Sequence, residues 1–332
     1  MTGPLAGIRI VEFAGLGPAP FAAMLLADFG ADVIRIERPG SPQLMPQDPD
    51  FMLRGRPTVE LDLKSDAGRA DAAALVARAD ALIEGLRPGV MERLGMGPAD
   101  MLAANPSLVY GRMTGWGQSG PLAARAGHDI NYIAQTGLLG DFGGGGMYLA
   151  FGLLAAVFHA RATGQGQVLD AAIVDGTAHL GTMIFSMLNS GVWADQRRAN
   201  ILDGAAPFYR CYECACGGFM AVGAIEPQFW AALVAGLNIT PVADQMDRAR
   251  WLDLSDQLAR AFAGKTRDAW AEIFAETDAC ATPVLSMAEA QSDPHLAARG
   301  VFGGTGPRPA PVLSETPAVA GDARPARLYS GG

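Results

Sequence analysis

The chain has 332 residues, half of them hydrophobic, and carries 34 acidic against 25 basic side chains, for a net charge of −9 at pH 7. This length is sufficient for a large hydrophobic core and about two domains. The acidic balance argues against a nucleic-acid-binding protein, which would have a basic face, but it allows a local basic pocket for a phosphorylated ligand.

Three features of the sequence predict a cytoplasmic protein. No charged segment precedes an apolar stretch at the N-terminus, so we expect no signal peptide. The most apolar run, residues 147–160, is shorter than a membrane span, so we expect no membrane insertion. The four cysteines are compatible with a reducing compartment.

The first half of the chain alternates apolar segments with helical patterns. We expect strands over residues 8–13, 32–37, 58–63, 80–85 and 107–113, and a helix over residues 18–30 between the first two. Ser65 is a plausible N-cap for the helix that follows the third strand. Strands and helices that alternate in this way predict a parallel sheet with helices on both faces, and hence the α/β class.

The pattern changes after Asn131. A glycine-rich turn precedes the apolar helix, a strand is expected within 164–176, and residues 183–208 lack a clear period and indicate a connector. The alternation over 210–225 predicts a hairpin, and helical patterns follow at 227–237 and 256–264. The last segment, from Gly303, is rich in proline and glycine and should be mostly irregular.

A dinucleotide site is suggested by Gly15 and Gly17 after the first strand, with Glu37 about twenty residues on. However, Pro20 replaces the third glycine of that fingerprint, and Pro18 is also a proline. Two prolines remove two of the N–H groups that would hold a pyrophosphate. A tight strand-to-helix turn is therefore the better interpretation.

A metal site is suggested by Cys211, Cys214 and Cys216, with Cys280 far along the chain. Structural zinc sites normally use two paired clusters of ligands. Strand alternation also places Cys214 on the opposite face from Cys211. We therefore predict a half-buried hairpin cysteine and no metal.

His128 and Asp141 are the candidate acid–base residues. His128 follows a glycine in a segment with turn character, and Asp141 stands 13 residues later beside four glycines. An imidazole is the best general base at neutral pH, and a desolvated carboxylic acid could stay protonated. A core histidine and a helix-capping aspartate are equally compatible with these residues, so the residues alone leave both interpretations open.

Several motifs together resemble the 2-methylacyl-CoA racemases of the family III CoA-transferase superfamily, in the right order and over nearly the whole chain. These motifs are "GPLAGIRIVEFAGLGPAPFAAMLLADFGADVIRIERP", "LDLKSDAG", "IEGLRPGVMERLG", "RMTGWGQSGP", "AGHDINY", "GDFGGGGM", "GQGQVLDAAIVDG" and "VGAIEPQF".

The resemblance implies a Rossmann-like large domain, a smaller α+β domain, and a homodimer of two interlocked rings. It places the large, coenzyme-A-binding domain at residues 1–182, with 305–332 returning to it. The connector is then 183–208 and the small domain 209–304. The active site would lie between the large domain of one subunit and the small domain of the other.

The resemblance also implies a function, the inversion of the α-carbon of a 2-methylacyl-CoA thioester. His128 and Asp141 would flank that carbon, one removing the α-proton and the other returning a proton to the opposite face of an enolate. The backbone N–H of Asp129 would bind the enolate oxygen. Glu226 from the partner chain would hold His128 in the right tautomer, although a helix-start carboxylate is nearly as good an interpretation.

Coenzyme A is part of the substrate in this family, so no separate cofactor is expected. By resemblance, its binding positions are Arg38, Leu61, Asp62, Leu63, Lys64, Gly85, Leu86, Arg87, Arg93, Gly127, Ile130, Asn131 and Tyr132. The arginines and Lys64 would hold the phosphates.

Two alternatives and one departure remain. A family III CoA-transferase would use Asp141 as a nucleophile, and a silent homologue would only bind coenzyme A; His128 beside "DINY" favours the racemase. The segment between His128 and Asp141 is considerably shorter than in the racemases. Either the chain has short loops or residues are missing from it, and the preference for acyl-chain length would differ accordingly because such loops shape pockets.

Overall fold

The computed structural model describes residues 3–40, 50–125, 128–136, 145–322 and 327–328. The chain divides into two compact units. The first contains Met1–Thr182 together with Ala297–Gly332, and the second contains Met183–Leu296. Each unit has a hydrophobic core of its own.

The first unit is built on a seven-stranded sheet in the order β12-β3-β2-β1-β4-β5-β6. All neighbouring strands pair in parallel. The strands are β1 (Arg9–Phe13), β2 (Asp32–Glu37), β3 (Thr58–Glu60), β4 (Ala81–Glu84), β5 (Val109–Thr114), β6 (Gln167–Ala172) and β12 (Arg327–Leu328). The predicted α/β class with a parallel sheet is confirmed.

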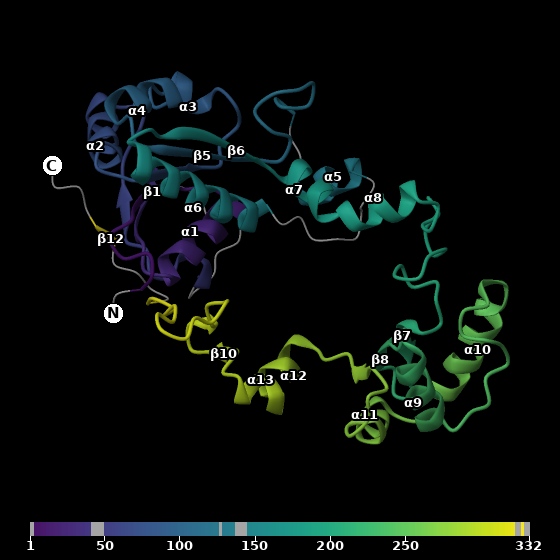
Figure 1. Cartoon of the computed structure of the whole chain (residues 1–332). Coiled ribbons are helices and arrows are strands. Elements are labelled where there is room, and N and C mark those ends of the chain that lie inside the picture. Colours follow the sequence, from purple (N-terminus) through teal and green to yellow (C-terminus); the bar gives the residue numbers. More distant parts are fainter. Residues whose placement is uncertain (1–2, 41–49, 126–127, 137–144, 323–326, 329–332) are drawn as a thin grey trace. The chain divides into compact units, whose positions relative to one another are not determined.

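Helices cover both faces of this sheet (Figure 1). One face is covered by α1 (Pro18–Asp28) and α6 (Gly145–Thr163), and the other by α2 (Asp66–Val76), α3 (Val90–Arg93) and α4 (Pro98–Ala104). Successive strand residues point to opposite faces, so Ile10 of β1 packs with the first group and Val11 with the second. The Ser65 hydroxyl accepts a hydrogen bond from the Gly68 N–H at 3.0 Å, which confirms the predicted cap of α2.

Within the described part of the chain, α6 is one helix with the length and hydropathy to cross a membrane. Leu149, Leu153 and Val157 on this helix are buried in the core against the sheet. Packing in the core therefore accounts for the apolar residues on one face of this helix.

A buried carboxylate at the centre of the sheet organises three segments. Glu12 of β1 is fully buried and accepts hydrogen bonds from Arg35 of β2, at 3.0 Å, and from Arg56 just before β3. Arg56 also donates to the carbonyl of Met52 in the 3-10 turn η1 (Phe51–Leu53). Burial, the largest cause, raises the pKa of Glu12 against the opposing effect of both arginines.

A second buried ion pair connects the first unit to its returning C-terminal segment. The Arg54 Nε lies 3.0 Å from Asp28 Oδ1 at the end of α1, and both residues are 3% exposed. Arg54 Nη1 donates to the carbonyls of Thr305 and Pro307 at 3.0 and 2.7 Å. These carbonyls belong to the hairpin of β10 (Phe302–Gly303) and β11 (Gly306–Pro307).

The second unit contains an antiparallel sheet in the order β7-β8-β9. Its strands are β7 (Tyr209–Glu213), β8 (Phe219–Gly223) and β9 (Ala281–Pro283). Its helices include α9 (Pro227–Leu237), α10 (Trp251–Phe262), α11 (Arg267–Phe274) and α12 (Met287–Ser292), with η2 (Arg248–Arg250) before α10. The helix α13 (Pro294–Ala298) follows α12 and includes the boundary between the two units. The predicted hairpin and the helix at 227–237 are confirmed.

One sequence-based boundary was wrong, and one helix was missed. The expected strand within 164–176 ends at Ala172, where α7 (Ile173–Leu180) begins and buries Ile173, Gly176 and Thr177 on one face. The expected connector contains α8 (Thr182–Asn189). Eight residues are too few for a 3.6-residue period to stand out in a long irregular stretch.

Replacing Arg54 with methionine should lower the free energy of unfolding by about 3–5 kcal/mol, because the Asp28 carboxylate is left buried without its partner. The midpoint of urea unfolding, followed by circular dichroism, measures this change. Arg69→Met is the control, since its partner Asp66 is 98% exposed and such a pair contributes less than about 1 kcal/mol. Equal losses in the two variants would contradict the assigned role of Arg54.

Candidate active site

A cleft of about 1340 Å³ lies at the carboxyl ends of the central strands. It is lined by residues 14–18 after β1, 85–88 after β4 and 113–116 at the end of β5. The chain passes from β1 to β2 on one side and later to β4 on the other, so the strand order reverses at this point. Ligands of open α/β sheets bind in such a crevice.

His128 lines this cleft at the start of α5 (Asp129–Gln135). Its carbonyl accepts hydrogen bonds from the N–H groups of Asn131 and Tyr132, at 2.8 and 3.3 Å. Its own N–H donates to the Asn131 side chain at 2.9 Å. The bond from the N-cap N–H to the side chain of the third helical residue is one half of a capping box, and it helps to fix the helix start. The residue is exposed, so the interpretation as a core histidine was wrong.

The aromatic wall beside His128 depends on one glycine. The Tyr132 ring meets the Trp116 ring edge-on, with centroids 4.8 Å apart. A Cβ atom at Gly115 would lie only 2.0 Å from the Tyr132 ring, so the ring occupies the space of a side chain. Burial is the main cause that raises the pKa of Tyr132, which keeps the phenol neutral.

The cleft brings together about half of the described residues that the sequence singled out. Those that line it are Gly85, Leu86, Arg87, His128, Asp129, Asn131 and Tyr132. Ile130 belongs to α5 but is 63% exposed and does not line the cleft. Gly127 and Asp141 lie outside the described residues, so the distance between the proposed acid and base is not given by the structure.

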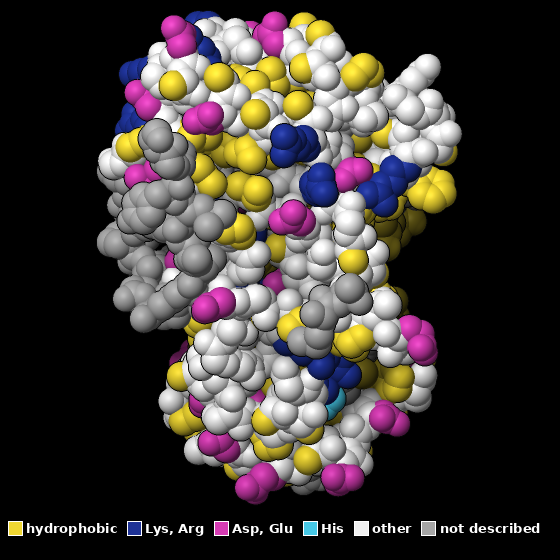
Figure 2. Space-filling model, turned by 90° about the vertical axis from the view of Figure 1, so that its left-hand side faces the viewer, with side chains coloured by type: hydrophobic (Ala, Val, Ile, Leu, Met, Phe, Trp, Pro, Cys, Tyr) yellow, Lys and Arg dark blue, Asp and Glu magenta, His cyan; other side chains and the backbone are white. Residues whose placement is uncertain are grey.

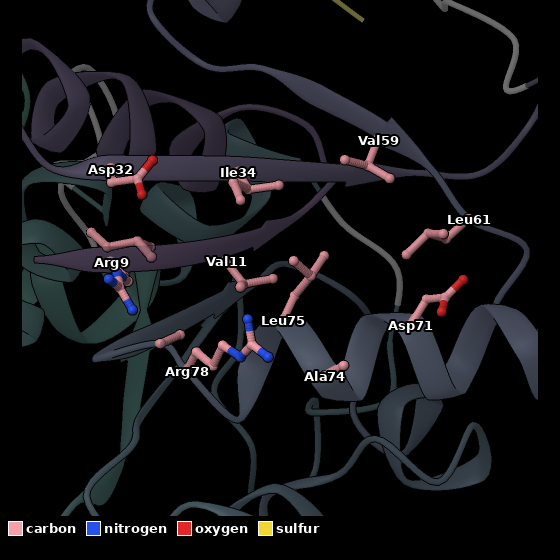
Figure 3. Close-up of a pocket in the computed structure, with 12 residues that line it drawn as sticks. Arg9, Val11, Asp32, Ile34, Val59, Leu61, Asp71, Ala74, Leu75 and Arg78 are labelled. Atoms are coloured by element: carbon pink, nitrogen blue, oxygen red, sulfur yellow. The ribbon is translucent and has the colours of Figure 1, made fainter. Parts of the chain in front are cut away.

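The segment Leu61–Lys64 lies at the same edge of the sheet, just after β3. Asp62 and Lys64 are exposed and Leu63 is half-buried. Leu61 is buried and borders a second cavity of about 570 Å³ between α2 and the first three strands. Figure 3 shows Leu61 and Asp71 at one end of this cavity and Arg9 and Asp32 at the other. The Leu61 side chain therefore packs in the core, and its backbone N–H donates to the carbonyl of Glu37 at 2.9 Å.

The four predicted phosphate-binding cations lie after successive strands or in the helix that follows: Arg38 after β2, Lys64 after β3, Arg87 after β4 and Arg93 in α3. All four are exposed, and none has an ion-pair partner among the residues that the structure describes. Both acidic and basic side chains are exposed on the face shown in Figure 2. Of these four cations, only Arg87 lines the cleft, and the other three lie on neighbouring segments of the same unit. Unpaired cations on these segments suit an anionic ligand even in an acidic chain.

An ion-pair network behind the cleft was missed by the sequence analysis. Glu84, fully buried at the end of β4, accepts a hydrogen bond from Arg112 Nε at 2.8 Å, and its other oxygen accepts one from the Leu86 N–H at 2.7 Å. Arg112 also holds Glu92 of α3 with both terminal nitrogens, at 2.7 and 3.2 Å. The signal was a charge inside each of two apolar strands, "ALIE" and "VYGRMT", which pair Glu84 with Arg112 in register.

The pKa values of the two carboxylates shift in opposite directions. Burial is the largest cause at Glu84 and raises its pKa despite the Leu86 and Arg112 hydrogen bonds. The Arg112 hydrogen bond is the largest cause at Glu92 and lowers its pKa. The same arginine thus keeps Glu92 charged at neutral pH and offsets the cost of burying Glu84.

Glu226 lies in the second unit, immediately before α9. It is exposed and occupies the N-cap position of α9, as expected for a helix-start carboxylate, although its carboxylate makes no capping hydrogen bond. The buried side chain of Gln245 donates to the carbonyls of Ala224 and Ile225 at 2.9 and 2.8 Å, which fixes the preceding backbone. Sequence reasoning gave no signal for Gln245.

The cysteines follow the predicted alternation, since Cys214 is buried and Cys211 is exposed. All four cysteines are free thiols. Among the described residues, no group of three or more histidine, cysteine or acidic side chains is placed to hold a metal ion.

Replacing Gly115 with alanine should displace the Tyr132 ring and cost about 1–3 kcal/mol of stability, because the new methyl group has no free volume. The near-ultraviolet circular dichroism of the Trp116–Tyr132 pair should change with it. Gly304→Ala is the control, since nothing lies within 4 Å of the position that its Cβ would take. An unchanged spectrum for the Gly115 variant would show that the ring has room to move.

Comparison with known proteins assigns the family. The sequence model of CoA-transferase family III matches residues 5–144 and 138–326. The chain is 45% identical to alpha-methylacyl-CoA racemase of Mus musculus and 44% identical to that of Homo sapiens, in each case over 95% of this chain and 88% of the relative. These alignments confirm the resemblance read from the motifs. They span 339 positions although the chain has only 332 residues, so the relatives have additional residues at internal positions.

A solved structure shows the same fold. A CAIB/BAIF family protein from Brucella suis superposes with a TM-score of 0.81 over 97% of this chain and 96% of its own, at 23% sequence identity. The parallel sheet, the cleft at its switch point and these matches agree, and the chain belongs to CoA-transferase family III.

Proposed function

We propose that the protein is a 2-methylacyl-CoA racemase, which inverts the α-carbon of the acyl thioester by proton transfer through an enolate. The observation that carries this proposal is the exposed imidazole of His128 in the cleft, in a chain 45% identical to a named alpha-methylacyl-CoA racemase. A CoA-transferase needs no general base at this position, whereas a racemase does.

Coenzyme A would be held at the carboxyl edge of the sheet. The exposed Arg38, Lys64, Arg87 and Arg93 supply positive charge for its phosphates, with the fork of arginine suited to two oxygens at once. The backbones of Leu61–Lys64, Gly85–Arg87 and Gly127–Tyr132 complete the proposed contacts. Because coenzyme A is part of the substrate, the proposed reaction needs no other cofactor.

In the proposed reaction, neutral His128 removes the α-proton from one face of the thioester, and protonated Asp141 returns a proton to the other. The roles exchange for the opposite enantiomer. Inversion requires an acid and a base on opposite faces of the carbon, with different protonation states at rest. The two residues are 13 positions apart in the sequence, a length that can reach across a substrate.

The enolate oxygen needs a hydrogen-bond donor. The start of α5 leaves the N–H of Asp129 without an intrahelical partner and adds the positive end of the helix dipole. We assign the oxyanion-binding role to this N–H group. In an interlocked homodimer, the partner subunit's Glu226 would orient His128, which fits a carboxylate that is exposed and makes no capping hydrogen bond.

A second copy of the chain is supported by an apolar stripe on α6. Met147, Phe151, Leu154 and Phe158 lie on one face of the helix, and the two phenylalanines are 74% and 81% exposed. Contiguous apolar surface of this kind marks an interface. We propose that this stripe is covered in a homodimer. We also propose that the protein is cytoplasmic, where the four free cysteines would remain reduced.

Two alternatives remain on the same fold. A CoA-transferase would form an acyl anhydride on Asp141 and then an enzyme–coenzyme A thioester, and a silent homologue would bind coenzyme A without reaction. The position of His128 in the cleft favours the racemase over both.

Incubation of one epimer of a 2-methylacyl-CoA in D₂O tests the proposed reaction. We expect deuterium at the α-carbon together with loss of optical purity, and a fall of about 10²–10⁴-fold for His128→Ala and for Asp141→Asn. Nuclear magnetic resonance and chiral chromatography measure the two signals. His295→Ala is the matched control, since this histidine lies in α13 and is not among the residues that line the cleft. Transfer of coenzyme A to an added carboxylate, without exchange, would favour the transferase.

Replacing both Phe151 and Phe158 with lysine should convert the proposed dimer to monomer, because two charges would be buried in the interface. Size-exclusion chromatography with light scattering gives the mass. The control is Leu252→Lys, an equally exposed apolar residue, 73%, on α10. A wild-type chain with the mass of a monomer would overturn the dimer.

A further inference from the structure

The network of Glu84, Arg112 and Glu92 lies directly behind two of the proposed phosphate-binding arginines. Glu84 precedes the turn that carries Arg87, and its carboxylate accepts the backbone N–H of Leu86 within that turn. Glu92 is the neighbour of Arg93 on α3. Arg112 of β5 joins the two carboxylates, so one side chain connects both cation-bearing segments.

We propose that Arg112 is a positioning residue for coenzyme A, which fixes the 85–93 segment and keeps Arg87 and Arg93 free for its phosphates. This inference rests on the proposed function of the cleft.

The geometry of Arg112 supports a bridging role that lysine cannot fill. Its Nε donates a hydrogen bond to Glu84 only, while its two terminal nitrogens donate to the two oxygens of Glu92. The guanidinium is 7% exposed and lies 5.8 Å from the Tyr110 ring centroid, where its orientation is further restricted. A fork with donors in fixed directions can satisfy two carboxylates in one plane, whereas an ammonium is a point charge.

The charge balance supports the second part of the proposal. Glu84 and Glu92 are the acids nearest in sequence to Arg87 and Arg93, and both are engaged by Arg112. No described acid pairs with either of those two arginines. Without Arg112, two carboxylates would stand uncompensated beside the site of a polyanion and would repel it.

The variant Glu92→Gln distinguishes a positioning role of the Arg112–Glu92 link from a purely electrostatic effect on coenzyme A binding. The variant removes a negative charge, so an electrostatic effect alone would tighten coenzyme A binding. Loss of the bidentate link to α3 should instead weaken binding by about tenfold, the value of one charge-assisted hydrogen bond. Its side chain is 44% exposed, so the substitution buries no unpaired charge and should leave the fold intact. Arg112→Lys keeps the positive charge beside Glu84 and should show the same loss.

The experiment measures the dissociation constant of free coenzyme A by titration calorimetry, and KM and kcat with a 2-methylacyl-CoA. We expect KM to rise with the dissociation constant while kcat changes less than twofold, because neither substitution touches the reacting carbon. Asp32→Asn is the control for removal of one charge, since this exposed acid lies at the amino end of β2, at the opposite edge of the sheet.

Each result has one meaning. Tighter binding in Glu92→Gln, or unchanged binding in both variants, would overturn the positioning role. A fall in kcat alone would do the same, because it would place the network in the chemical step. A wild-type chain that does not bind coenzyme A would overturn the proposed function instead, so the two failures are distinguishable.

Discussion

The carboxylate of Glu12 is the constraint on which the first unit depends. It lies in the central strand, fully buried, and a charge in that position is tolerated only with partners. Those partners are Arg35 on the next strand and Arg56 at the entrance to the third. Since Arg56 also holds the carbonyl of Met52, which lines the cleft, the interaction that orders the strands also shapes a wall of the site.

The same principle recurs at the other side of the switch point. Glu84 and Arg112 form a second buried ion pair between neighbouring strands. The Glu84 carboxylate also accepts the N–H of Leu86, in a loop that borders the cleft. Parallel strands buried on both faces leave little room for polar groups. Each of these charges therefore lies close to the sheet's carboxyl edge, where the chain leaves the core and a ligand can enter.

The periodicity of the sequence was sufficient to predict the strands from β1 to β5, the cap at Ser65 and the β7–β8 hairpin, because each of these depends on neighbours along the chain. It was not sufficient for the ion pairs. Glu84 and Arg112 are 28 residues apart, and their partnership depends on which strands become adjacent and in what register. Leu61 shows the same limit, since a binding position inferred from a motif has a side chain that packs in the core.

For the site, the motif around His128 was informative because a local feature, the start of α5, places the imidazole in the cleft. The contribution of Gly115 could not be predicted from the sequence. A side chain at this position would collide with the ring of Tyr132, which lies 17 residues further along the chain. The role of Gln245 beneath Glu226 depends likewise on the tertiary fold of the second unit.

The return of the C-terminal segment has a consequence for how the chain is made. The seventh strand of the sheet, β12, leaves the ribosome after the whole second unit has been synthesised. At roughly 5–20 residues per second, β3 remains an open edge for roughly 10–30 s after β6 has emerged. During that time Arg54 lacks the carbonyls of Thr305 and Pro307, and an unpaired parallel strand is exposed to other nascent chains. The newborn protein should therefore be most dependent on chaperones in this interval.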